Sequence, residues 1–412
     1  MQESVGKFRI GLLSFSPIRD DPRVRRHGDA LAAAGYQVTA VGLGGGRSAA
    51  PTWQILDIDA PDTMPYAGWQ RWKRRTRWIT ASLLSRIVPQ SALSAQFALD
   101  GRAEPMLCLA RQVKADVWIA NDWNTLPIGR RLASEQGALL IYDSHEFATE
   151  EYSQSLRWRL FNRPFRKALE SSALGRVHSV ITVSEGIATR LARLYSLAEI
   201  PLVVRNMPRF EPSTLRQAGQ AIRVLYHGSV APGRGLEDTI ASVPLWRQEF
   251  ALTIRGQGAP EYLAHLERLA TQSGAGGRVS FVDPVAMIDL VRAASLFDIG
   301  ILALPDHSAH NTYALPNKFF EYVMAGLALC VTDLPEMAPL MSRYRLGQSI
   351  AGSGPKAIAA AINAFDRPSI DTAKANALAA ARELCWDEEQ KILLACIAKL
   401  VSEQPAAMTV RA

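Results

Sequence analysis

The chain has 412 residues, more than one hydrophobic core usually supports, and its 48% hydrophobic and 21% charged composition is that of an ordinary globular protein with two domains. It has no apolar run of about 18 residues and no basic-then-apolar start, so we expect no spanning helix, no signal peptide and a cytoplasmic location. Lys and Arg outnumber Asp and Glu by 28 to 19 in residues 1–210, against 18 to 20 afterwards, so the first half is expected to meet an anionic partner, either nucleic acid or a membrane surface.

Residues 1–205 alternate short apolar runs with amphipathic stretches, the pattern of strands and helices wound on a parallel sheet. An expected helix at 21–34 is closed by Gly35, a residue favoured just after a helix end. The expected strands of this Rossmann-like first domain are 8–15, 36–43, 116–120, 138–142, 179–183 and 201–204.

The second half repeats the scheme after a proline-containing, weakly apolar stretch at 206–221, which we interpret as an interdomain linker. A second Rossmann-like domain is expected at 222–370, and helices at 371–412 are expected to follow it. Its strands are predicted at 222–226, 250–254, 278–282, 298–302 and 329–331, and its helices at 234–247, 260–273, 285–295 and 316–325. The predicted fold class is therefore α/β, with two Rossmann-like domains facing a cleft.

A basic amphipathic segment is predicted near 66–88, within a stretch, 63–99, that has no acidic residue. On a helical wheel an apolar stripe separates from the cations, a pattern typical of a helix lying on an anionic membrane. The stripe is Trp69, Trp72, Ile79, Leu83 and Ile87, and the cations are Lys73, Arg74 and Arg77. Two alternatives are a basic helix packed by its tryptophans onto the domain and a single-strand nucleic-acid binder, which no accompanying RRM, KH or helix-turn-helix pattern supports.

The segment 313–331 has the features of a polyanion site. Pro316 suits the first turn of a helix, whose unpaired N–H groups attract phosphate, and Lys318 adds a cation there. Glu321, one turn later, suits the hydroxyls of a nucleotide's ribose. A surface helix with a Lys/Glu pair is the alternative.

Two glycine-bearing turns precede this segment. Gly228, Gly233 and Arg234 lie in a loop after the first strand of the second domain, where glycines let backbone amides approach phosphate and an arginine binds it in a fork. Gly256 ends the next strand. Each turn has an equally simple alternative, a glycine required by the backbone alone.

The order of these parts closely resembles the C-terminal domain of GT-B glycosyltransferases of the family-4-like group. In that family Arg234 matches a lysine that binds the donor diphosphate, and Glu321 matches the second of two glutamates, which holds the ribose. Ser229 stands where the family often has arginine, and Tyr313 stands where it has its first glutamate. The resemblance implies further donor contacts at Asp283, Ala314, Leu315 and Asn317.

The first domain resembles the acceptor domain of the same family, and the last helices resemble its ending, in which the final helix crosses back onto the N-domain. His145 matches a histidine that contacts the donor sugar, with Asp143 and Glu146 as rival acid or base candidates. Asp21 and Arg23 are expected to border the acceptor, although Asp21 is equally suited to cap a helix.

The resemblance implies transfer of a sugar from a nucleotide-diphosphate donor, with retention of configuration, in cell-surface polysaccharide or glycolipid synthesis. A lipid-linked acceptor at the inner membrane face is expected, and nucleic acid is not expected as a partner. The four cysteines show no metal-ligand spacing, so neither a metal nor a cofactor is predicted. A sugar-nucleotide epimerase of the same fold and a non-catalytic binding or scaffold protein remain alternatives.

Overall fold

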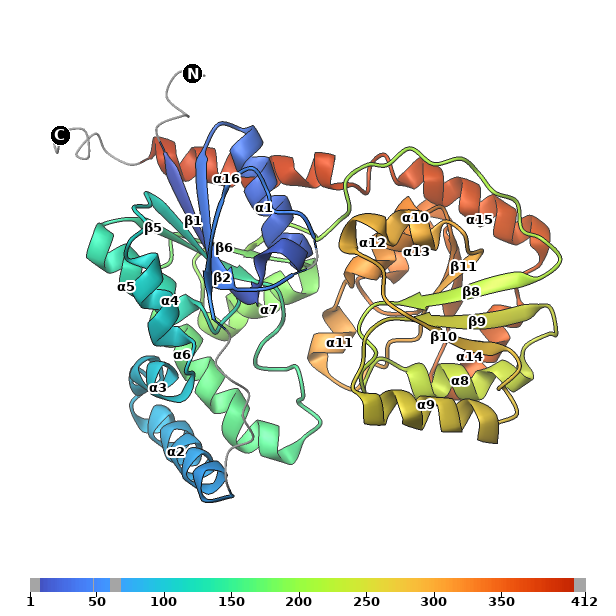
Figure 1. The fold of residues 1–412 in the computed structure, drawn as a ribbon, viewed down its shortest axis with the longest axis horizontal. Helices are drawn as coiled ribbons and strands as arrows, with labels where there is room; N and C mark the ends of the chain where they lie inside the picture. The colour runs from blue at the N-terminus through green and yellow to red at the C-terminus, as the bar shows by residue number, and fades with distance from the viewer. Residues whose placement is uncertain (1–7, 47, 60–67, 404–412) are drawn as a thin grey trace. The chain divides into compact units, whose positions relative to one another are not determined.

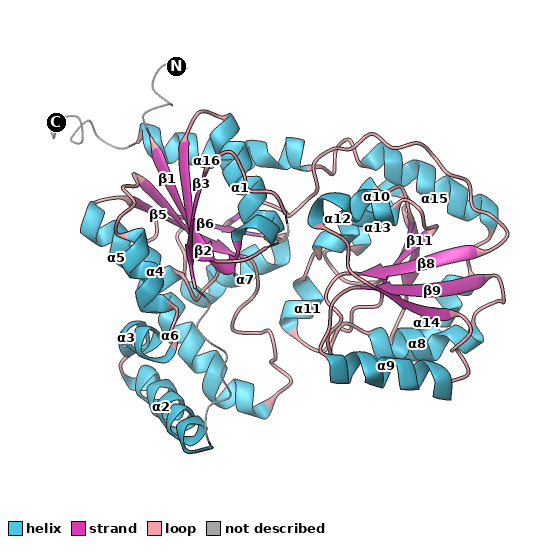
Figure 2. Ribbon diagram, in the orientation of Figure 1, coloured by secondary structure: helices cyan, strands magenta, loops and turns pink. Residues whose placement is uncertain are grey.

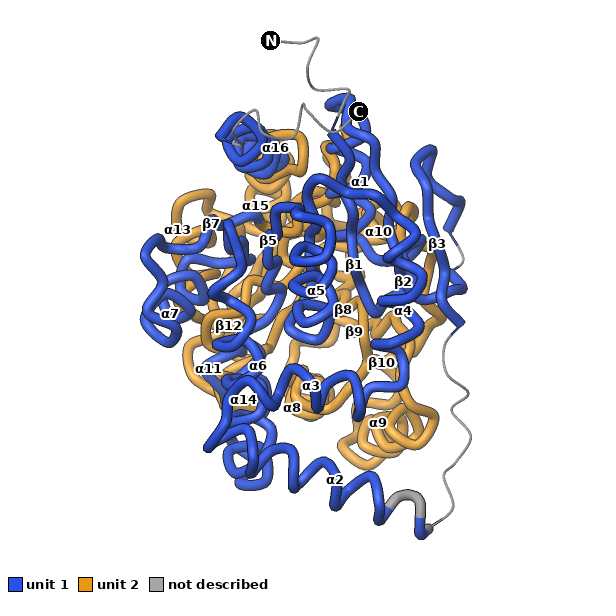
Figure 3. Tube along the Cα trace, turned by 90° about the vertical axis from the view of Figure 1, so that its left-hand side faces the viewer, with its two compact units in different colours: residues 1–204, 308–310, 390–412 blue, residues 205–307, 311–389 orange. Residues whose placement is uncertain are grey.

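The computed structural model describes residues 8–46, 48–59 and 68–403, which form two compact units (Figure 3). Unit 1 comprises residues up to Val204, Ser308–His310 and the chain from Gln390, and unit 2 comprises Arg205–His307 and Asn311–Glu389. The start of the chain, on which the leader prediction depends, Tyr66 of the basic segment, and residues 404–412 lie outside the described part.

Unit 1 is built on a seven-stranded parallel sheet in the order β3-β2-β1-β4-β5-β6-β7 (Figure 2). Six strands confirm the predicted runs, whereas the edge strand β3 was not predicted, because its pattern is mostly half-exposed and carries no apolar run. The strands are β1 Arg9–Pro17, β2 Gln37–Leu43, β3 Gln54–Ile58, β4 Val117–Asn121, β5 Leu139–Ser144, β6 Ser179–Thr182 and β7 Leu202–Val203.

Helices α4, α5 and α6 pack on one face of this sheet, and α1 and α7 lie on the other (Figure 1). The hairpin of α2 and α3 packs against α6. No helix in the described ranges is long and apolar enough to cross a bilayer. The helix bounds are α1 Pro22–Ala33, α2 Gly68–Ile87, α3 Ser91–Leu99, α4 Ala103–Ala110, α5 Leu126–Gln136, α6 Arg163–Leu174 and α7 Glu185–Tyr195.

Unit 2 contains a six-stranded parallel sheet in the order β10-β9-β8-β11-β12-β13. Its strands are β8 Ile222–His227, β9 Phe250–Arg255, β10 Val279–Val282, β11 Ile299–Leu302, β12 Ala328–Thr332 and β13 Gly347–Ile350, of which only β13 was not predicted. One face is covered by α8 Leu236–Ser242, α9 Pro260–Gln272 and α14 Gly354–Asn363. The other is covered by α10 Leu290–Ala294, α12 Asn317–Met324, α13 Ala338–Tyr344 and α15 Arg367–Ala380. A short helix, α11, spans Ala309–Tyr313.

The stretch predicted as a linker is bound along unit 2. The backbone N–H of Phe210 donates to Asp387 and that of Ala218 donates to Asp371, each at 2.7 Å, while Pro208 accepts from the N–H of Trp386. The last helix, α16 Trp386–Ser402, begins in unit 2, and from Gln390 its residues belong to unit 1. The predicted return of the C-terminal helix to the first domain is confirmed.

Candidate active site

Both sheets reverse their strand order once, between β1 and β4 in unit 1 and between β8 and β11 in unit 2. Ligands of open α/β sheets bind at the carboxyl ends of the strands beside such a reversal. Most of the residues predicted from the sequence follow one of these strands or its neighbour, so each unit has a polar edge of its own.

Buried charge dominates the edge of unit 1. Arg23 on α1 makes a two-pronged ion pair with Asp143 at the end of β5, with N···O distances of 2.7 and 2.6 Å, and donates a third bond to the carbonyl of Val204 at 2.6 Å. Arg23 is 3% exposed and Asp143 is fully buried. Burial would raise the pKa of Asp143, but Arg23 and His145 hold it below its usual range.

His145 lies against this pair and is held from both sides. Its Nε2 is 3.1 Å from both Asn121 Oδ1 and Asp143 Oδ2, and its Nδ1 is 3.2 Å from Asp122 Oδ2. Burial would lower the pKa of His145, but the Asp122 and Asp143 carboxylates outweigh it and raise that pKa to about 10. His145 is therefore a fixed imidazolium at neutral pH, with each ring nitrogen facing a carboxylate.

A second histidine near Asp143 is neutral, whereas His145 is cationic. His27 is fully buried on α1, and its Nδ1 is 3.6 Å from Asp143 Oδ2. Burial and the Arg23 charge lower the pKa of His27 to about 3. Asp143 thus faces one cationic and one neutral imidazole.

These contacts bear on three sequence-based predictions. Asp143 is buried and paired with Arg23, which favours a positioning role over its predicted role as an acid or base. Arg23 is equally enclosed, which argues against its predicted contact with the acceptor. Asp21 caps α1 by accepting from the N–H groups of Arg23 and Val24, the structural alternative given above.

Glu146, the third predicted catalytic residue, remains a candidate because its side chain is exposed. It lies beside Glu151, which also contacts Arg166. Burial raises the pKa of Glu151 to about 8 against the opposing charge of Arg166, and the Glu146 carboxylate adds to the shift. One proton is therefore retained near this carboxylate pair at neutral pH.

On the edge of unit 2, two glycines are required by close backbone contacts. A Cβ on Gly235 would lie 1.8 Å from the carbonyl oxygen of Ala303, and one on Gly256 would lie 1.8 Å from that of Gly228. The backbone alternative therefore accounts for Gly256. Gly233, with a φ of 81°, has open space around it by comparison, since its nearest neighbour would be His307 at 3.5 Å.

This edge carries two cations, of which Lys318 lies against Gly228. Lys318, in the first turn of α12, donates to the hydroxyl of Tyr226 at 3.0 Å and lies 4.3 Å from the centre of its ring. A Cβ on Gly228 would be 3.1 Å from Lys318 Nζ, so the ammonium lies against the bare glycine backbone. Arg234 and Ser229 are exposed on the same loop, and within the described ranges no ion pair involves Arg234.

Glu321 lies one turn after Lys318 and is 7% exposed. Its Oε2 is 2.9 Å from Nε2 of His227, the last residue of β8. His227 in turn stacks on Tyr322, at 4.8 Å between ring centres, and its backbone N–H donates to the Tyr322 hydroxyl oxygen at 3.1 Å. The Glu321 carboxylate therefore lies in contact with the end of β8.

The other residues predicted to contact the donor differ in how exposed their side chains are. Asp283 is exposed just after β10, and Leu315 is buried. Asn317 is the first residue of α12, whose N-cap, Pro316, provides no side-chain cap. Tyr313 ends α11, and the N–H of Ala314 bonds back to Asn311 at 3.2 Å.

Sequence reasoning missed three residues of these edges: Asn121, Asp122 and His227. Asn121 ends β4, Asp122 follows it, and His227 ends β8, so the rule that ligands bind at strand carboxyl ends would have found them. Asp122 also has a φ of 67°, unusual for a residue other than glycine, while its N–H donates to the carbonyl of Asp143 at 2.8 Å.

The predicted membrane stripe is exposed on α2. Trp69 is 60% exposed and Trp72 is 66% exposed, and Lys73 Nζ lies 4.4 Å from the Trp69 ring centre. The helix packs on unit 1 through other residues, among them the buried Ser82, whose hydroxyl donates to the carbonyl of Phe161 at 2.6 Å. Trp78 of the same helix is half-buried, with its ring centre 6.1 Å from that of Phe161, so packing of the helix by a tryptophan holds for Trp78 but not for Trp69 and Trp72.

Family models match both parts of the chain. Residues 21–206 match a glycosyl transferase 4-like domain, and residues 221–365 match glycosyl transferases group 1. No curated relative matches the sequence.

Solved structures with the same fold cover nearly the whole chain at low identity. Sucrose-phosphate synthase from Thermosynechococcus elongatus is 16% identical with a TM-score of 0.71, covering 96% of this chain and all of that one. HepE from Anabaena, solved with UDP and glucose, is 14% identical with a TM-score of 0.70 and the same coverage. WaaG, a glycosyltransferase involved in lipopolysaccharide biosynthesis, is 12% identical with a TM-score of 0.65, covering 93% of this chain and 98% of its own. With two parallel-sheet units, a polar edge on each and both family models in sequence order, the chain belongs to the group 1 glycosyltransferases of the GT-B fold, which use nucleotide-sugar donors.

Proposed function

We propose that this glycosyltransferase moves a sugar from a uridine diphosphate donor to a lipid-linked acceptor at an anionic membrane surface, with retention and without a divalent ion. The observation that carries the donor half of the proposal is the position of Lys318. Lys318 is in the first turn of α12, and its ammonium lies against Gly228. Gly228 directly follows β8, the strand beside the reversal of the sheet. A fixed cation beside an open backbone is what a departing diphosphate requires.

Lys318 and Arg234 neutralise the charge that develops on the leaving diphosphate as the glycosyl bond breaks. The uncapped N–H groups at the start of α12 add to this attraction. These groups supply positive charge without coordination chemistry, which is why the proposal needs no metal. Glu321 accepts hydrogen bonds from the ribose hydroxyls, while His227 keeps its carboxylate in place.

His145 contributes a fixed positive charge and does not remove protons. With a pKa of about 10 it is protonated throughout the neutral range, and Asp122 and Asp143 fix the orientation of its ring. Because both ring nitrogens already face carboxylates, His145 acts by positioning Asp122 and Asp143 at the ends of β4 and β5. Glu146 is the remaining candidate for proton transfer, because it is exposed and lies beside a carboxyl group of raised pKa.

UDP-sugars are the first donors to test, since HepE was solved with UDP-glucose and TarM from S. aureus with UDP. The acceptor half of the proposal rests on α2. Two exposed tryptophans beside Lys73, Arg74 and Arg77 suit the headgroup region of an anionic leaflet, where each cation contributes about 1 kcal/mol. WaaG, which shares the fold, is a glycosyltransferase involved in lipopolysaccharide biosynthesis, and this supports testing lipid-linked acceptors for this chain.

A thermal-shift panel of nucleoside diphosphates and their sugars tests the donor assignment, because ligand stabilisation grows with ligand concentration relative to the dissociation constant. We expect UDP and one UDP-sugar to raise the midpoint, EDTA to leave turnover unchanged, and NMR to show the donor's anomeric configuration in the product. Stabilisation by no nucleotide would contradict the donor assignment. Loss of turnover in EDTA would contradict the metal-free mechanism.

Vesicle flotation tests the acceptor surface. We expect binding to vesicles that contain phosphatidylglycerol and little binding to pure phosphatidylcholine. A double variant, Trp69→Ala with Trp72→Ala, should lose most of this binding, whereas replacing the buried Trp118 would test only stability. Equal flotation of the double variant and the wild type would remove α2 from the membrane contact.

A further inference from the structure

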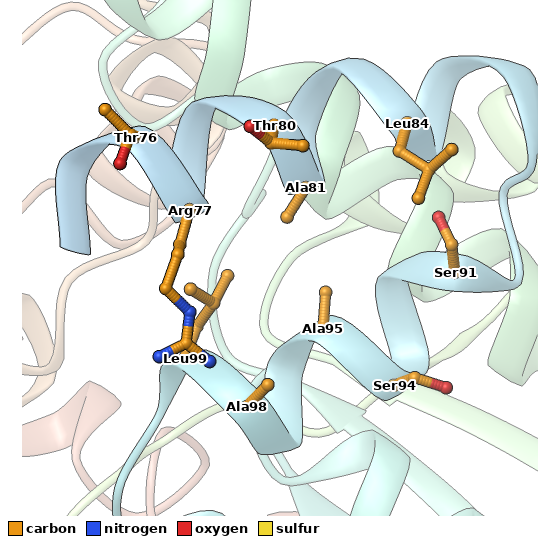
Figure 4. Close-up of a pocket in the computed structure, with 10 residues that line it drawn as sticks. All are labelled: Thr76, Arg77, Thr80, Ala81, Leu84, Ser91, Ser94, Ala95, Ala98 and Leu99. Atoms are coloured by element: carbon orange, nitrogen blue, oxygen red, sulfur yellow. The ribbon is translucent and has the colours of Figure 1, made fainter. Parts of the chain in front are cut away.

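A groove of about 510 Å³ runs between α3 and α2, the helix that carries the exposed Trp69 and Trp72; Figure 4 shows its lining. It is lined from α2 by Thr76, Arg77, Thr80, Ala81 and Leu84, and from α3 by Ser91, Ser94, Ala95, Ala98 and Leu99. Its size is within the range of small-molecule sites, roughly 300–1,000 Å³. From Thr76 to Leu84 it follows about 12 Å of helix axis.

The floor of the groove is a fixed part of unit 1. Ala81, Ala95 and Leu99 pack against a buried cluster formed by Ala92 and residues of α6. Most side chains of the lining are alanine, serine or threonine, so they leave the groove open while the helices stay anchored. A ligand would find this space already formed.

Charge in the groove lining has one sign, and Asp100, the acidic residue that follows Leu99, is paired with Arg102. Arg77 is the charged residue of the lining, and Figure 4 shows it reaching from α2 across to Leu99 on α3. Lys73, one turn earlier, lies on the same side of α2, and no acidic residue occurs in 63–99. Leu84, which is 47% exposed, lies two turns beyond Arg77. Arg77 and Leu99 therefore lie at one end of the groove, and Leu84 and Ser91 lie at the other (Figure 4).

We propose that this groove binds one acyl chain of an anionic membrane lipid, with the lipid phosphate on Arg77 and Lys73 and the chain extending toward Leu84. The position relative to the tryptophan stripe supports this occupant: Thr76 and Thr80 lie between the stripe residues Trp72 and Leu83 and also line the groove. A lipid drawn from the leaflet under α2 could therefore enter the groove without crossing water. This inference rests on the proposed membrane contact and gives it a specific lipid site.

The test uses the whole protein and soluble monomeric probes, so that it does not depend on vesicles. Lysophosphatidylglycerol, below its micelle concentration, supplies one chain and one phosphate, whereas glycerol 3-phosphate supplies the phosphate without a chain. Native mass spectrometry and calorimetry should show one lysophosphatidylglycerol per protein and no binding of glycerol 3-phosphate at the same concentration. Equal binding of both probes, or no binding of either, would overturn the proposal.

Two variants locate the site. Ala98→Trp fills the groove from α3 and should weaken lysophosphatidylglycerol binding at least tenfold, while Ala360→Trp, at an exposed helical alanine of unit 2, should leave it unchanged. Arg77→Gln should weaken binding of lysophosphatidylglycerol several-fold. It should not change binding of monomyristoylglycerol, which has an acyl chain but no phosphate. Undiminished binding by Ala98→Trp would overturn the proposal.

The outcome is separable from that of the proposed function. The Trp69→Ala, Trp72→Ala double variant should lose vesicle flotation yet retain lysophosphatidylglycerol, since neither tryptophan lines the groove. Wild-type protein that floats with vesicles and turns over a UDP-sugar, but binds no monomeric lipid, would overturn the groove alone.

Discussion

The two units share a strand order but differ in how their polar edges are neutralised. The edge of unit 1 is internally paired: Arg23, Asp143, His145 and Asp122 alternate in charge, and two of the four are almost fully buried. The edge of unit 2 presents Lys318 and Arg234 beside glycine backbone. The same fold thus carries a preformed charge network in one unit and cations available to a ligand in the other.

This difference predicts that charge removal affects stability in unit 1 and catalysis in unit 2. Breaking a buried ion pair by removing one partner costs about 3–5 kcal/mol, because the other charge is left buried without a partner. Removing one stabilising group from a charged leaving group costs roughly 10²–10³ in rate with little loss of stability. The variants below test each half, in order of decreasing effect.

The largest expected effect is that of Arg23→Met. It leaves Asp143 buried without its two-pronged partner, so the free energy of unfolding should fall by about 3–5 kcal/mol in urea denaturation. Arg193→Met, at an exposed site on α7, should change it by less than about 0.5 kcal/mol. If Arg23→Met does not fold, Arg23→Lys, which keeps the charge, should be intermediate; wild-type stability in either would contradict the assigned role.

The second largest effect is expected from Lys318→Ala, which should reduce catalysis. Without the ammonium beside Gly228, kcat/KM for the donor should fall about 100-fold, or roughly 2.7 kcal/mol, while the melting midpoint stays close to that of the wild type. Lys356→Ala on α14 removes an exposed lysine of the same unit and should change kcat/KM less than twofold. Steady-state kinetics with both variants measure the difference, and equal values would remove Lys318 from the reaction.

The sequence predicted the cations of unit 2 better than the paired charges of unit 1. Lys318 and Glu321 could be placed because a proline, a lysine and a glutamate at helical spacing carry a local signal. The Arg23–Asp143 pair joins residues 120 positions apart, so only the packing of α1 beside β5 reveals it. A sequence pattern marks a polar residue at a strand end but does not show whether its charge is already neutralised.

The fold was predicted more completely than the site for the same reason. Central strands such as β1 and β4 are buried on both faces and appear as apolar runs, whereas β3 and β13 at the sheet edges are half-exposed and carry no such run. The groove between α2 and α3 arises from short side chains facing one another, a relation that neither helix shows on its own.

Asp122→Asn tests the network of unit 1 through its pH dependence. The pKa of His145 is about 10 in the fold and about 6.5 in an unfolded chain, so its contribution to stability is complete below pH 6.5 and is lost as the pH rises to 10. Asparagine has nearly the same shape as aspartate but no charge. The free energy of unfolding of the variant should therefore be lower than that of the wild type by about 1–2 kcal/mol below pH 6.5, and this difference should vanish above pH 10. Urea denaturation across this range measures it.

Asp238→Asn, at an exposed site on α8, is the matched control and should show no such slope. A deficit in Asp122→Asn that is constant with pH would mean that Asp122 supports its loop without acting on the charge of His145.

The smallest effect is expected from adding a cation to unit 2. Ser229 is exposed beside Gly228, at the position where the family often has arginine, and Ser229→Arg would place a second guanidinium on the loop that carries Arg234. An added cation on this edge should strengthen binding of the donor diphosphate by about 1 kcal/mol, so we expect KM for the donor to fall three- to tenfold and kcat to change less. Ser134→Arg on α5 of unit 1 adds the same charge to the protein and should leave KM unchanged. An equal fall in KM in both variants would trace the gain to net charge, and no fall in either would mean that Lys318 and Arg234 already neutralise the diphosphate fully.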